Sequence, residues 1–348
     1  MKRKLILGLT LITASMITLS SCSIINSLKK TDKKEDKECY ANTSFGKYPQ
    51  TKVTKESLIQ ELNIISGPKP TATYKYLWTD YNYYYNGVVT SYMYYQDIDY
   101  DNDGDYDYRG VYFTKYRPVL TTDTEIDESQ LEKYSNQHLN GYDINTIYWF
   151  KYETIKWNIV DENDGKKMLV SSLVLDSQEY YPSVLDDEQF YHNGGIGYAN
   201  NYALSNIRKF INNDFYNTAF TDSEKEKIET TLVDNSLEST DGLKDKCICE
   251  DTYDKIFLLS CKEFKTYFDY SIKKWENTRD DSPIEATDYA KCQGIDKYFP
   301  RWLRSPGVAG GIPSANVIKY ASVYSALEKS DWSAASYIGV DPACWVKL

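Results

Sequence analysis

The stretch IYWFKYETIKWNIVDENDGKKMLVSS, residues 147–172, holds the pattern that decides the fold. Two runs within it, Ile147–Tyr152 and Ile155–Val160, are rich in the aromatic and β-branched residues that favour strands. Asp164-Gly165 follows them, and this dipeptide favours a tight turn between antiparallel strands. It leads into a further apolar run, Lys167–Ser172. The stretch therefore predicts strands joined by a hairpin turn.

Upstream, residues of about 70–120 show a period of two and are rich in tyrosine and valine. Asn86-Gly87 stands between two such runs and predicts a two-residue hairpin turn. A second turn at Asp103-Gly104 separates Tyr92–Tyr95 from Tyr108–Tyr116. This region is predicted to be a Tyr-rich β-meander.

Helical spacing appears between Asn200 and Phe220, where apolar residues recur on one predicted face. Thr221–Glu224 has the form of a capping box and predicts the start of a second helix. Asp254–Ser260 has the composition of a buried strand. Strand-rich and helical segments thus follow each other in blocks, which indicates an α+β fold.

The N-terminus has the pattern of a bacterial lipoprotein signal. Lys2-Arg3-Lys4 precedes the apolar run Leu5–Leu19, which is short for a transmembrane helix, and Leu19-Ser20-Ser21-Cys22 closes it. Residues 1–21 are therefore predicted to be a signal peptide and Cys22 the acylated residue that attaches the chain to the lipid bilayer. The alternatives are an uncleaved amphiphilic anchor and an ordinary signal peptide followed by a chance cysteine.

The residues after Cys22 are predicted to lie on the outer face of the cell membrane. Residues 22–39 have mixed charges and almost no apolar side chains, so they are expected to form a flexible tether. Residues 40–348 are expected to form a single large extracellular domain, because no second apolar run is long enough to span a membrane.

Composition limits the partners of this domain. The chain has a net charge of −11, and without the three basic residues of the leader 37 basic groups face 51 acidic groups, which leaves −14. So acidic a surface argues against nucleic acid and anionic lipid headgroups as ligands. The chain has 34 tyrosines, which suit half-buried strands and surfaces that contact polar ligands.

Six cysteines remain besides Cys22, an even number in an oxidising compartment. Up to three disulfides with unknown pairing are expected, and the alternatives are unpaired thiols or a metal site around the Cys-x-Cys pair. A one-residue loop strains a disulfide, so the members of that pair are not expected to bridge each other. The six are Cys39, Cys247, Cys249, Cys261, Cys292 and Cys344.

The acidic run between Asp97 and Asp107 resembles half of a calcium-binding loop, with aspartates at alternate positions and a glycine at the turn. Gly110 occupies the position where an EF-hand needs its bidentate glutamate, and the flanking residues resemble strands. A solvated hairpin is the preferred interpretation, and no cofactor is required. The alternative is a calcium site outside an EF-hand, with the ligands Asp99, Asp101, Asp103 and Asp105.

Catalytic motifs are scarce. His138 and His192 are the only histidines, and no nucleophile elbow, paired-histidine helix or phosphate-binding loop occurs. Pairs of carboxylates are common in so acidic a chain, so no single pair points to glycoside hydrolysis.

Several strings along the chain resemble a bacterial domain family of unknown function that occurs in surface lipoproteins of gram-positive bacteria. The resemblance runs from Phe45 to the C-terminus. The strings are Phe45–Gln50, Tyr108–Phe113, Tyr116–Pro118, Tyr148–Glu153, Ile155–Trp157, Leu175–Ser177, Ile207–Asn212, Phe215–Phe220, Asp254–Ser260, Thr287–Ala290, Trp302–Pro306 and Gly339–Ala343.

The tail of this family, a Trp-x-Arg-Ser-Pro string followed by a final Gly-Val-x-Pro-Ala strand, is similar to the ends of C-type-lectin-like and formylglycine-generating-enzyme domains. The resemblance implies a curled antiparallel sheet with two adjacent helices and long loops, in a lectin-like core of about residues 145–348. Asp341 departs from the residue that many members have there, which puts a structural role for its side chain in doubt. The paired reactive cysteines of the formylglycine-generating enzymes have no counterpart, which argues against oxygenase chemistry.

Four residues are candidates for ligand binding. The indole of Trp302 could pack on a sugar ring and the guanidinium of Arg304 could donate paired hydrogen bonds, while Tyr83 and Tyr85 belong to the Tyr-rich region. The alternative for Trp302 and Arg304 is a structural role in the core.

The sequence therefore predicts a membrane-anchored lipoprotein with a non-catalytic, lectin-like domain that binds an extracellular glycan or protein. An extracellular hydrolase that uses two carboxylates on cell-wall or host glycans is the alternative, and it predicts a cleft with one carboxyl in an apolar setting. A spacer or adhesion protein without a small ligand is the third possibility.

Overall fold

The structure is a computed structural model that describes residues 41–71, 77–81, 83–85, 88–118, 132–181, 190–192, 195–197, 201–240, 249–268, 285–296, 301–309, 312–320 and 337–348. The chain divides into two compact units, Met1–Ala41 and Asn42–Leu348, and the described residues belong to the second unit apart from Ala41. The predicted signal peptide, Cys22 and almost the whole predicted tether lie outside the described residues.

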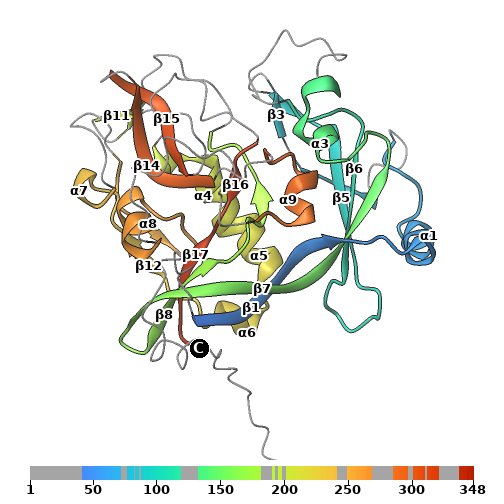
Figure 1. The fold of residues 1–348 in the computed structure, drawn as a ribbon, viewed down its shortest axis with the longest axis horizontal. Coiled ribbons are helices and arrows are strands. Elements are labelled where there is room, and N and C mark those ends of the chain that lie inside the picture. Colours follow the sequence, from blue (N-terminus) through green and yellow to red (C-terminus); the bar gives the residue numbers. More distant parts are fainter. Residues whose placement is uncertain are drawn as a thin grey trace, which may run out of the picture. The chain divides into compact units, whose positions relative to one another are not determined.

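The second unit is a mixed α+β structure with mostly antiparallel sheets (Figure 1), as the sequence predicted. Its largest sheet has seven strands in the order β17-β8-β7-β6-β5-β2, and β1 pairs with β7 beside this path. The strands of this sheet are β1 (Ala41–Lys52), β2 (Thr79–Asp80), β5 (Met93–Ile98), β6 (Tyr108–Phe113), β7 (Ile147–Asn163), β8 (Lys166–Ser171) and β17 (Ala343–Val346).

Strand β7 connects the two halves of this sheet. Its first part pairs with β6 and its second part with β8, so the two predicted runs form one strand of 17 residues. The hairpin turn is confirmed, because Asp164 and Gly165 have φ angles of 50° and 73°, as a two-residue hairpin turn of this kind requires. Trp157, at the centre of β7, is fully buried and its Nε1 donates to the carbonyl oxygen of Phe45 at 2.7 Å.

The Tyr-rich region forms hairpins but not one continuous meander. Strands β5 and β6 pair across the Asp103-Gly104 turn within the large sheet. Strands β3 (Tyr83–Tyr85) and β4 (Val88–Thr90) pair in the register expected for a turn at Asn86-Gly87, but they form a separate two-stranded sheet. The region is therefore divided between two sheets.

A second sheet has four strands in the order β15-β14-β16-β9. Strands β14 and β16 are parallel, and the other pairs of this sheet are antiparallel. Two further sheets have two strands each, β10 with β11 and β12 with β13. The bounds are β9 (Asp176–Ser177), β10 (Phe190–His192), β11 (Gly195–Gly197), β12 (Thr231–Val233), β13 (Thr252–Asp254), β14 (Arg301–Ala309), β15 (Ile312–Tyr320) and β16 (Gly339–Val340).

The helices are short. The predicted helix before Phe220 consists of four consecutive segments, one of which, η5, is π-helical. The helical segments are α1 (Glu56–Ile65), α3 (Asn136–Leu139), η4 (Tyr202–Leu204), α4 (Asn206–Phe210), η5 (Ile211–Phe215), α5 (Tyr216–Ala219), α6 (Asp222–Lys225), α7 (Leu237–Thr240), α8 (Cys261–Phe268) and α9 (Asp288–Cys292). The capping box is confirmed, because Thr221 and Glu224 exchange both of its hydrogen bonds at the start of α6.

The predicted strand Asp254–Ser260 is wrong for most of its length. Only Asp254 belongs to a strand, β13, and the next residues pair through a single bridge between Phe257 and Ala343. Ile256, Phe257 and Leu258 are nonetheless buried, so the apolar run marks a core segment rather than a strand. Periodicity alone does not distinguish these two cases.

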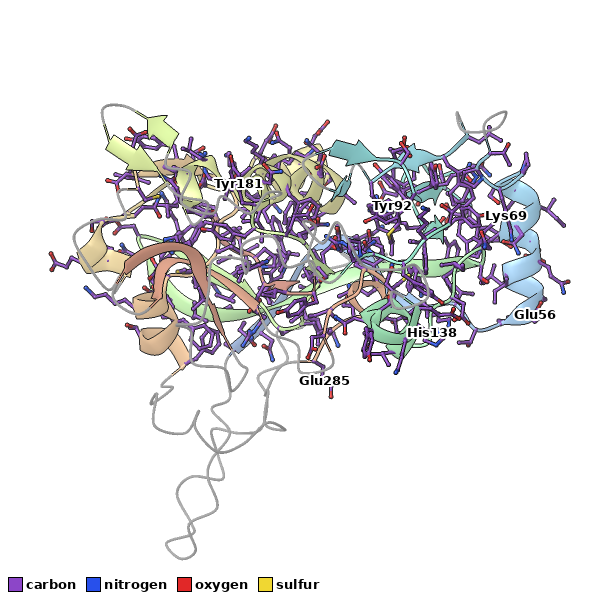
Figure 2. All side chains as sticks on the ribbon, turned by 90° about the horizontal axis from the view of Figure 1, so that it is seen from above. Glu56, Lys69, Tyr92, His138, Tyr181 and Glu285 are labelled. Carbon is purple, nitrogen blue, oxygen red and sulfur yellow. The ribbon has the colours of Figure 1, made fainter. Side chains whose placement is uncertain are left out.

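One large apolar core contains residues of the sheets and of the helical segments. Figure 2 shows all described side chains, which crowd the space between these elements. A smaller cluster joins helix α1 to the large sheet, where Leu62 packs with Ile98 and Trp149. The Trp149 Nε1 also donates to Asn63 Oδ1 at 2.9 Å. In the described part of the chain, no helix has the length and hydropathy needed to cross a bilayer.

Candidate functional site

A cavity of about 550 Å³ opens where the large sheet meets the helical segments α4, η5 and α5. Strands β1, β2, β5, β6 and β9 and helix α9 also contribute to its lining. Its buried floor consists of Tyr48, Arg109, Asp176, Glu179 and Tyr289. These residues come from segments far apart in the sequence, so the site exists only in the folded chain.

The mouth of the cavity is polar and open to solvent. Thr79, Lys209, Asn213 and Asp214 line it and are exposed. Two of them, Asn213 and Asp214, belong to η5, and π-helical segments of this kind often occur at functional sites.

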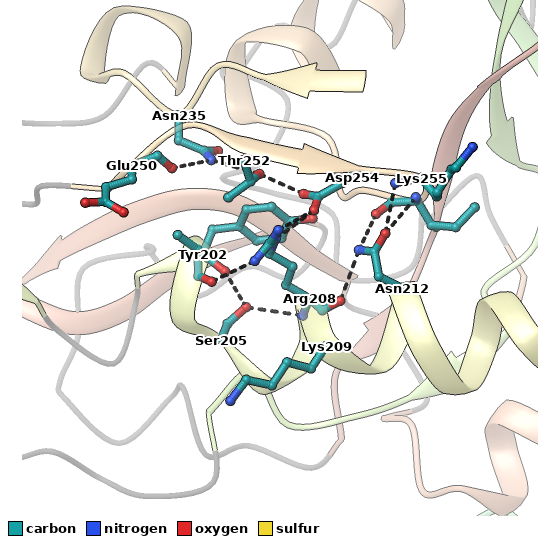
Figure 3. Close-up of polar contacts among 12 residues, drawn as sticks. Tyr202, Ser205, Arg208, Lys209, Asn212, Asn235, Glu250, Thr252, Asp254 and Lys255 are labelled. Atoms are coloured by element: carbon teal, nitrogen blue, oxygen red, sulfur yellow. Dashed lines mark hydrogen bonds and ion pairs between the residues drawn. The ribbon is translucent and has the colours of Figure 1, made fainter. Parts of the chain in front are cut away.

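A partly buried polar network connects the helical wall of the cavity to strand β13 and the residue after it (Figure 3). Arg208 on α4 donates through Nε to Asp254 Oδ1 at 2.8 Å, and Thr252 donates to the other oxygen of the same carboxylate at 2.7 Å. Asn212 accepts from the backbone N–H of Lys255 at 2.9 Å. Lys209 projects from the helix on the side away from Asp254. The network therefore holds one helix face rigidly while residues of the other face line the cavity.

Arg109 lies in the floor and is already neutralised. Its Nε and Nη2 contact the two carboxylate oxygens of Asp97 at 2.7 Å each, and Tyr152 donates to the same carboxylate at 3.0 Å. The guanidinium also lies 4.3 Å from the ring centroid of Tyr95. A bidentate pair of this kind fixes the orientation of the arginine.

Tyr289 connects Arg109 to Tyr81. Its hydroxyl accepts from Arg109 Nη1 at 3.3 Å and lies 2.8 Å from the hydroxyl of Tyr81. Burial raises the pKa of Tyr289, so the phenol stays protonated at neutral pH. Tyr289 therefore acts as a neutral hydrogen-bonding group.

Asp176 is the most perturbed carboxyl group of the floor. Its side chain accepts from Tyr48 Oη at 2.6 Å, from the Ser177 backbone N–H at 2.7 Å and from Gln178 Nε2 at 3.2 Å. Burial nevertheless raises the pKa of Asp176 to about 6, because the three donors offset only part of the desolvation of the charge. At neutral pH the floor therefore holds a largely ionised carboxylate.

Glu179 and Asp214 are further carboxylates of the cavity, and they lie in different settings. Glu179 forms a buried ion pair with Arg117, whose Nη1 also donates to the Ser177 carbonyl at 2.6 Å. Asp214 lies at the mouth, where desolvation raises its pKa and the nearby Arg109 lowers it. Of the two, only Asp214 is accessible to a ligand without breaking an existing pair.

The structure does not place the predicted Trp302 and Arg304 at a surface. Trp302 is 1% exposed, and its Nε1 donates to the Gln178 carbonyl at 2.7 Å. Arg304 forms a bidentate pair with Glu263 and donates to the Leu258 carbonyl at 2.8 Å. Neither lines the cavity, so the structural alternative fits both residues better than a role in binding.

Asp341 also has a structural role, contrary to the doubt raised by its departure from the family pattern. The side chain is buried and accepts from Ser171 Oγ at 2.5 Å. Its other oxygen pairs with Arg301 Nη1 at 2.5 Å.

For the predicted binding residues Tyr83 and Tyr85 the structure describes only the backbone, which forms β3. Their side chains lie outside the described part of the chain.

The acidic loop groups a different set of aspartates from the predicted one. Carboxylate oxygens of Asp99, Asp101 and Asp107 lie within 4.8 Å of one another, whereas Asp103 and Asp105 are not part of this group. Asp105 instead pairs with Lys47 at 3.1 Å. The side chain of Asp103 caps the turn by accepting from the Asp105 backbone N–H at 2.8 Å. Alternation in sequence therefore did not identify which carboxylates would converge.

Three of the predicted disulfide cysteines are free thiols. Cys292 and Cys344 are fully buried, and burial raises the pKa of each thiol. Cys249 is partly buried and its thiol lies 3.5 Å from Asn201 Oδ1. Cys39, Cys247 and the side chain of Cys261 lie outside the described residues.

The cavity residues were not selected from the sequence. Arg109, Asp176 and Tyr289 nevertheless lie within strings that carry the family resemblance, Tyr108–Phe113, Leu175–Ser177 and Thr287–Ala290. A signal was therefore present, but nothing in those strings indicated that they meet.

Comparison with known proteins gives one match. The model of a family described as Domain of unknown function (DUF6273) matches residues 164–348, which include Asp176, the helical wall and Tyr289. Neither the curated proteins nor the solved structures contain a significant match to this chain.

Proposed function

This chain belongs to the DUF6273 family of domains of unknown function, and we propose that it is a non-catalytic domain that binds a glycan in the cavity between the large sheet and helix α4. The observation that carries the proposal is the composition of the cavity wall. Tyrosine rings and planar hydrogen-bonding groups line one space of about 550 Å³. Sites for sugars combine these two elements, because a ring face packs on C–H groups while amides and carboxylates bind hydroxyls.

The aromatic part of the wall comes from Tyr81, Tyr95 and Phe210, which are partly buried and so keep some surface open. The rings of Tyr81 and Tyr95 lie 4.8 Å apart between centroids. Asn206 and Asn213 contribute amide groups to the helical wall. A ligand with both apolar ring faces and several hydroxyls matches this arrangement.

The proposal extends to how the domain is presented. We propose a lectin-like domain tethered through an acylated Cys22 to the outer face of the cell membrane, because the N-terminal pattern and the tail resemblance both favour it. The Cys22→Ser variant should then lose its membrane attachment in fractionated cells. Retention of the variant in the membrane fraction would contradict the lipoprotein assignment.

Catalysis by two carboxylates is a second candidate, favoured by the raised pKa of Asp176 in a cavity that also contains Asp214. The contacts of Asp176 argue against it, since its three donors stabilise the charged form and oppose the protonated form that a general acid needs. A hydrolase would release reducing ends from a bound oligosaccharide. A pure binding domain would leave the oligosaccharide intact over the same incubation.

A glycan array probed with the full chain tests the binding proposal. We expect binding that Asn206→Ala weakens by about tenfold, as loss of hydrogen bonds from one amide allows. Asn217→Ala is the matched control, because Asn217 is exposed on the next segment, α5, and does not line the cavity. Absence of binding to every glycan, or equal losses in the two variants, would overturn the proposal.

A further inference from the structure

The buried carboxylates of the domain differ in one respect. Glu179, Asp254 and Asp341 each form an ion pair with an arginine. Asp176 is equally buried, at 1% exposed, yet it forms no ion pair with any lysine or arginine of the described residues. Its three hydrogen-bond donors are all neutral groups.

The two guanidinium groups that influence Asp176 do not form an ion pair with it. Arg109 and Arg117 are close enough to affect the titration of Asp176. Each of them is already paired, Arg109 with Asp97 and Arg117 with Glu179. Buried charges in proteins are normally matched by an opposite charge in contact, because desolvation without one is costly.

The charge that remains in the cavity is negative. Once the two ion pairs are set aside, Asp176 and Asp214 line the cavity, and among the described lining residues Lys209 is the one exposed cation. The walls are also suited to a cation, because tyrosine ring faces attract positive charge and Tyr95 already covers the guanidinium of Arg109.

We propose that the ligand of this cavity carries a protonated amine which supplies the missing counter-charge for Asp176, while Asp214 at the mouth adds attraction for the cation, as in an amino sugar whose amine is not acetylated. This inference rests on the proposed function and narrows its substrate class. A neutral or N-acetylated sugar would leave the buried carboxylate unmatched, and an acidic sugar would add a second negative charge to it.

Isothermal titration of the full chain tests this with four probes that share one ring, namely glucosamine, glucose, N-acetylglucosamine and glucuronate. We expect glucosamine to bind at least about tenfold more tightly than the other three, since a charge-assisted contact contributes that much or more. Asp214→Asn should reduce this preference, measured as the ratio of the affinities for glucosamine and glucose. Asp222→Asn is the control, because Asp222 is a fully exposed carboxylate on α6 outside the cavity.

The outcomes separate this inference from the proposal on which it rests. Equal binding of glucose and glucosamine would overturn the proposed amine requirement and would still support glycan binding. Cyclohexylamine is a fifth probe, which has the amine but no hydroxyl groups. Its binding without binding of any sugar would support the amine requirement and overturn the glycan proposal. No binding of any probe would overturn both, and a preference for glucosamine that survives both Asp214→Asn and Asp176→Asn would refute the assignment to these carboxylates.

Discussion

Replacement of Asp176 by asparagine is expected to stabilise the domain at neutral pH, although the residue is fully buried. On folding the pKa of Asp176 rises from 3.8 to about 6. An acid with a raised pKa binds its proton more tightly in the folded state, so this group lowers the stability as the pH rises from about 4 to about 6. The shift corresponds to about 3 kcal/mol of unfolding free energy above that range.

The variant removes this penalty and loses one hydrogen bond. Asparagine Oδ1 still accepts from the Ser177 backbone N–H, but Nδ2 cannot accept from the Tyr48 hydroxyl. That loss costs about 1 kcal/mol. Asp176→Asn should therefore be about 2 kcal/mol more stable than the wild type at pH 7.5 and about 1 kcal/mol less stable at pH 4.

Urea unfolding of both proteins at a series of pH values measures this difference directly. The difference in unfolding free energy between the two proteins should change by about 3 kcal/mol between pH 4 and pH 7.5. This change does not depend on the energy assigned to the lost hydrogen bond. Asp222→Asn should show no such change, because that carboxylate is fully exposed. A difference between wild type and Asp176→Asn that stays constant from pH 4 to pH 7.5 would refute the assignment of a destabilised charge to Asp176.

Three other predictions concern the framework around the cavity. Arg304→Met should lower the unfolding free energy by about 3 kcal/mol, because it leaves the Glu263 carboxylate without its buried partner. The variant should keep the glycan affinity of the wild type. A loss of affinity in the folded variant would show that Arg304 takes part in binding. Gly110→Ala should cost about 1–3 kcal/mol in thermal unfolding, since the new Cβ would lie 2.7 Å from the Trp149 ring, and an unchanged Tm would show that the ring can move. Millimolar Ca²⁺ should raise the Tm of the full chain and Asp107→Asn should abolish the rise, whereas an insensitive Tm would favour the solvated hairpin.

The elements that the sequence predicted correctly are those with a local cause. Asp164-Gly165 forms its turn because two neighbouring residues adopt positive φ, and Thr221 and Glu224 cap α6 through contacts three residues apart. Strand β7 was predicted as two runs because the pattern weakens at Glu153 and Thr154, yet pairing with β1, β6 and β8 keeps it extended through them. Tertiary pairing thus overrode a local interruption.

The cavity could not be predicted in the same way, because no local pattern relates residue 48 to residue 289. Trp302 and Arg304 were chosen for their chemistry, and their burial depends on where β14 lies in the four-stranded sheet. The aspartates of the Asp97–Asp107 run were chosen by their spacing. In the folded turn, however, the Asp103 carboxylate accepts from the backbone N–H of Asp105. In each case the residue type was informative and its environment was decided by packing.

Stability and binding together separate a functional residue from a structural one in this domain. A carboxylate kept for the fold should behave as we expect of Glu263, whose partner variant Arg304→Met should lose stability and keep its affinity for a ligand. A carboxylate kept for a ligand should show the opposite pair of effects when it becomes an amide: a gain in unfolding free energy at neutral pH and a loss of affinity. Asp176 is expected to show both, because the same missing counter-charge makes it costly in the free protein and attractive to a cationic ligand.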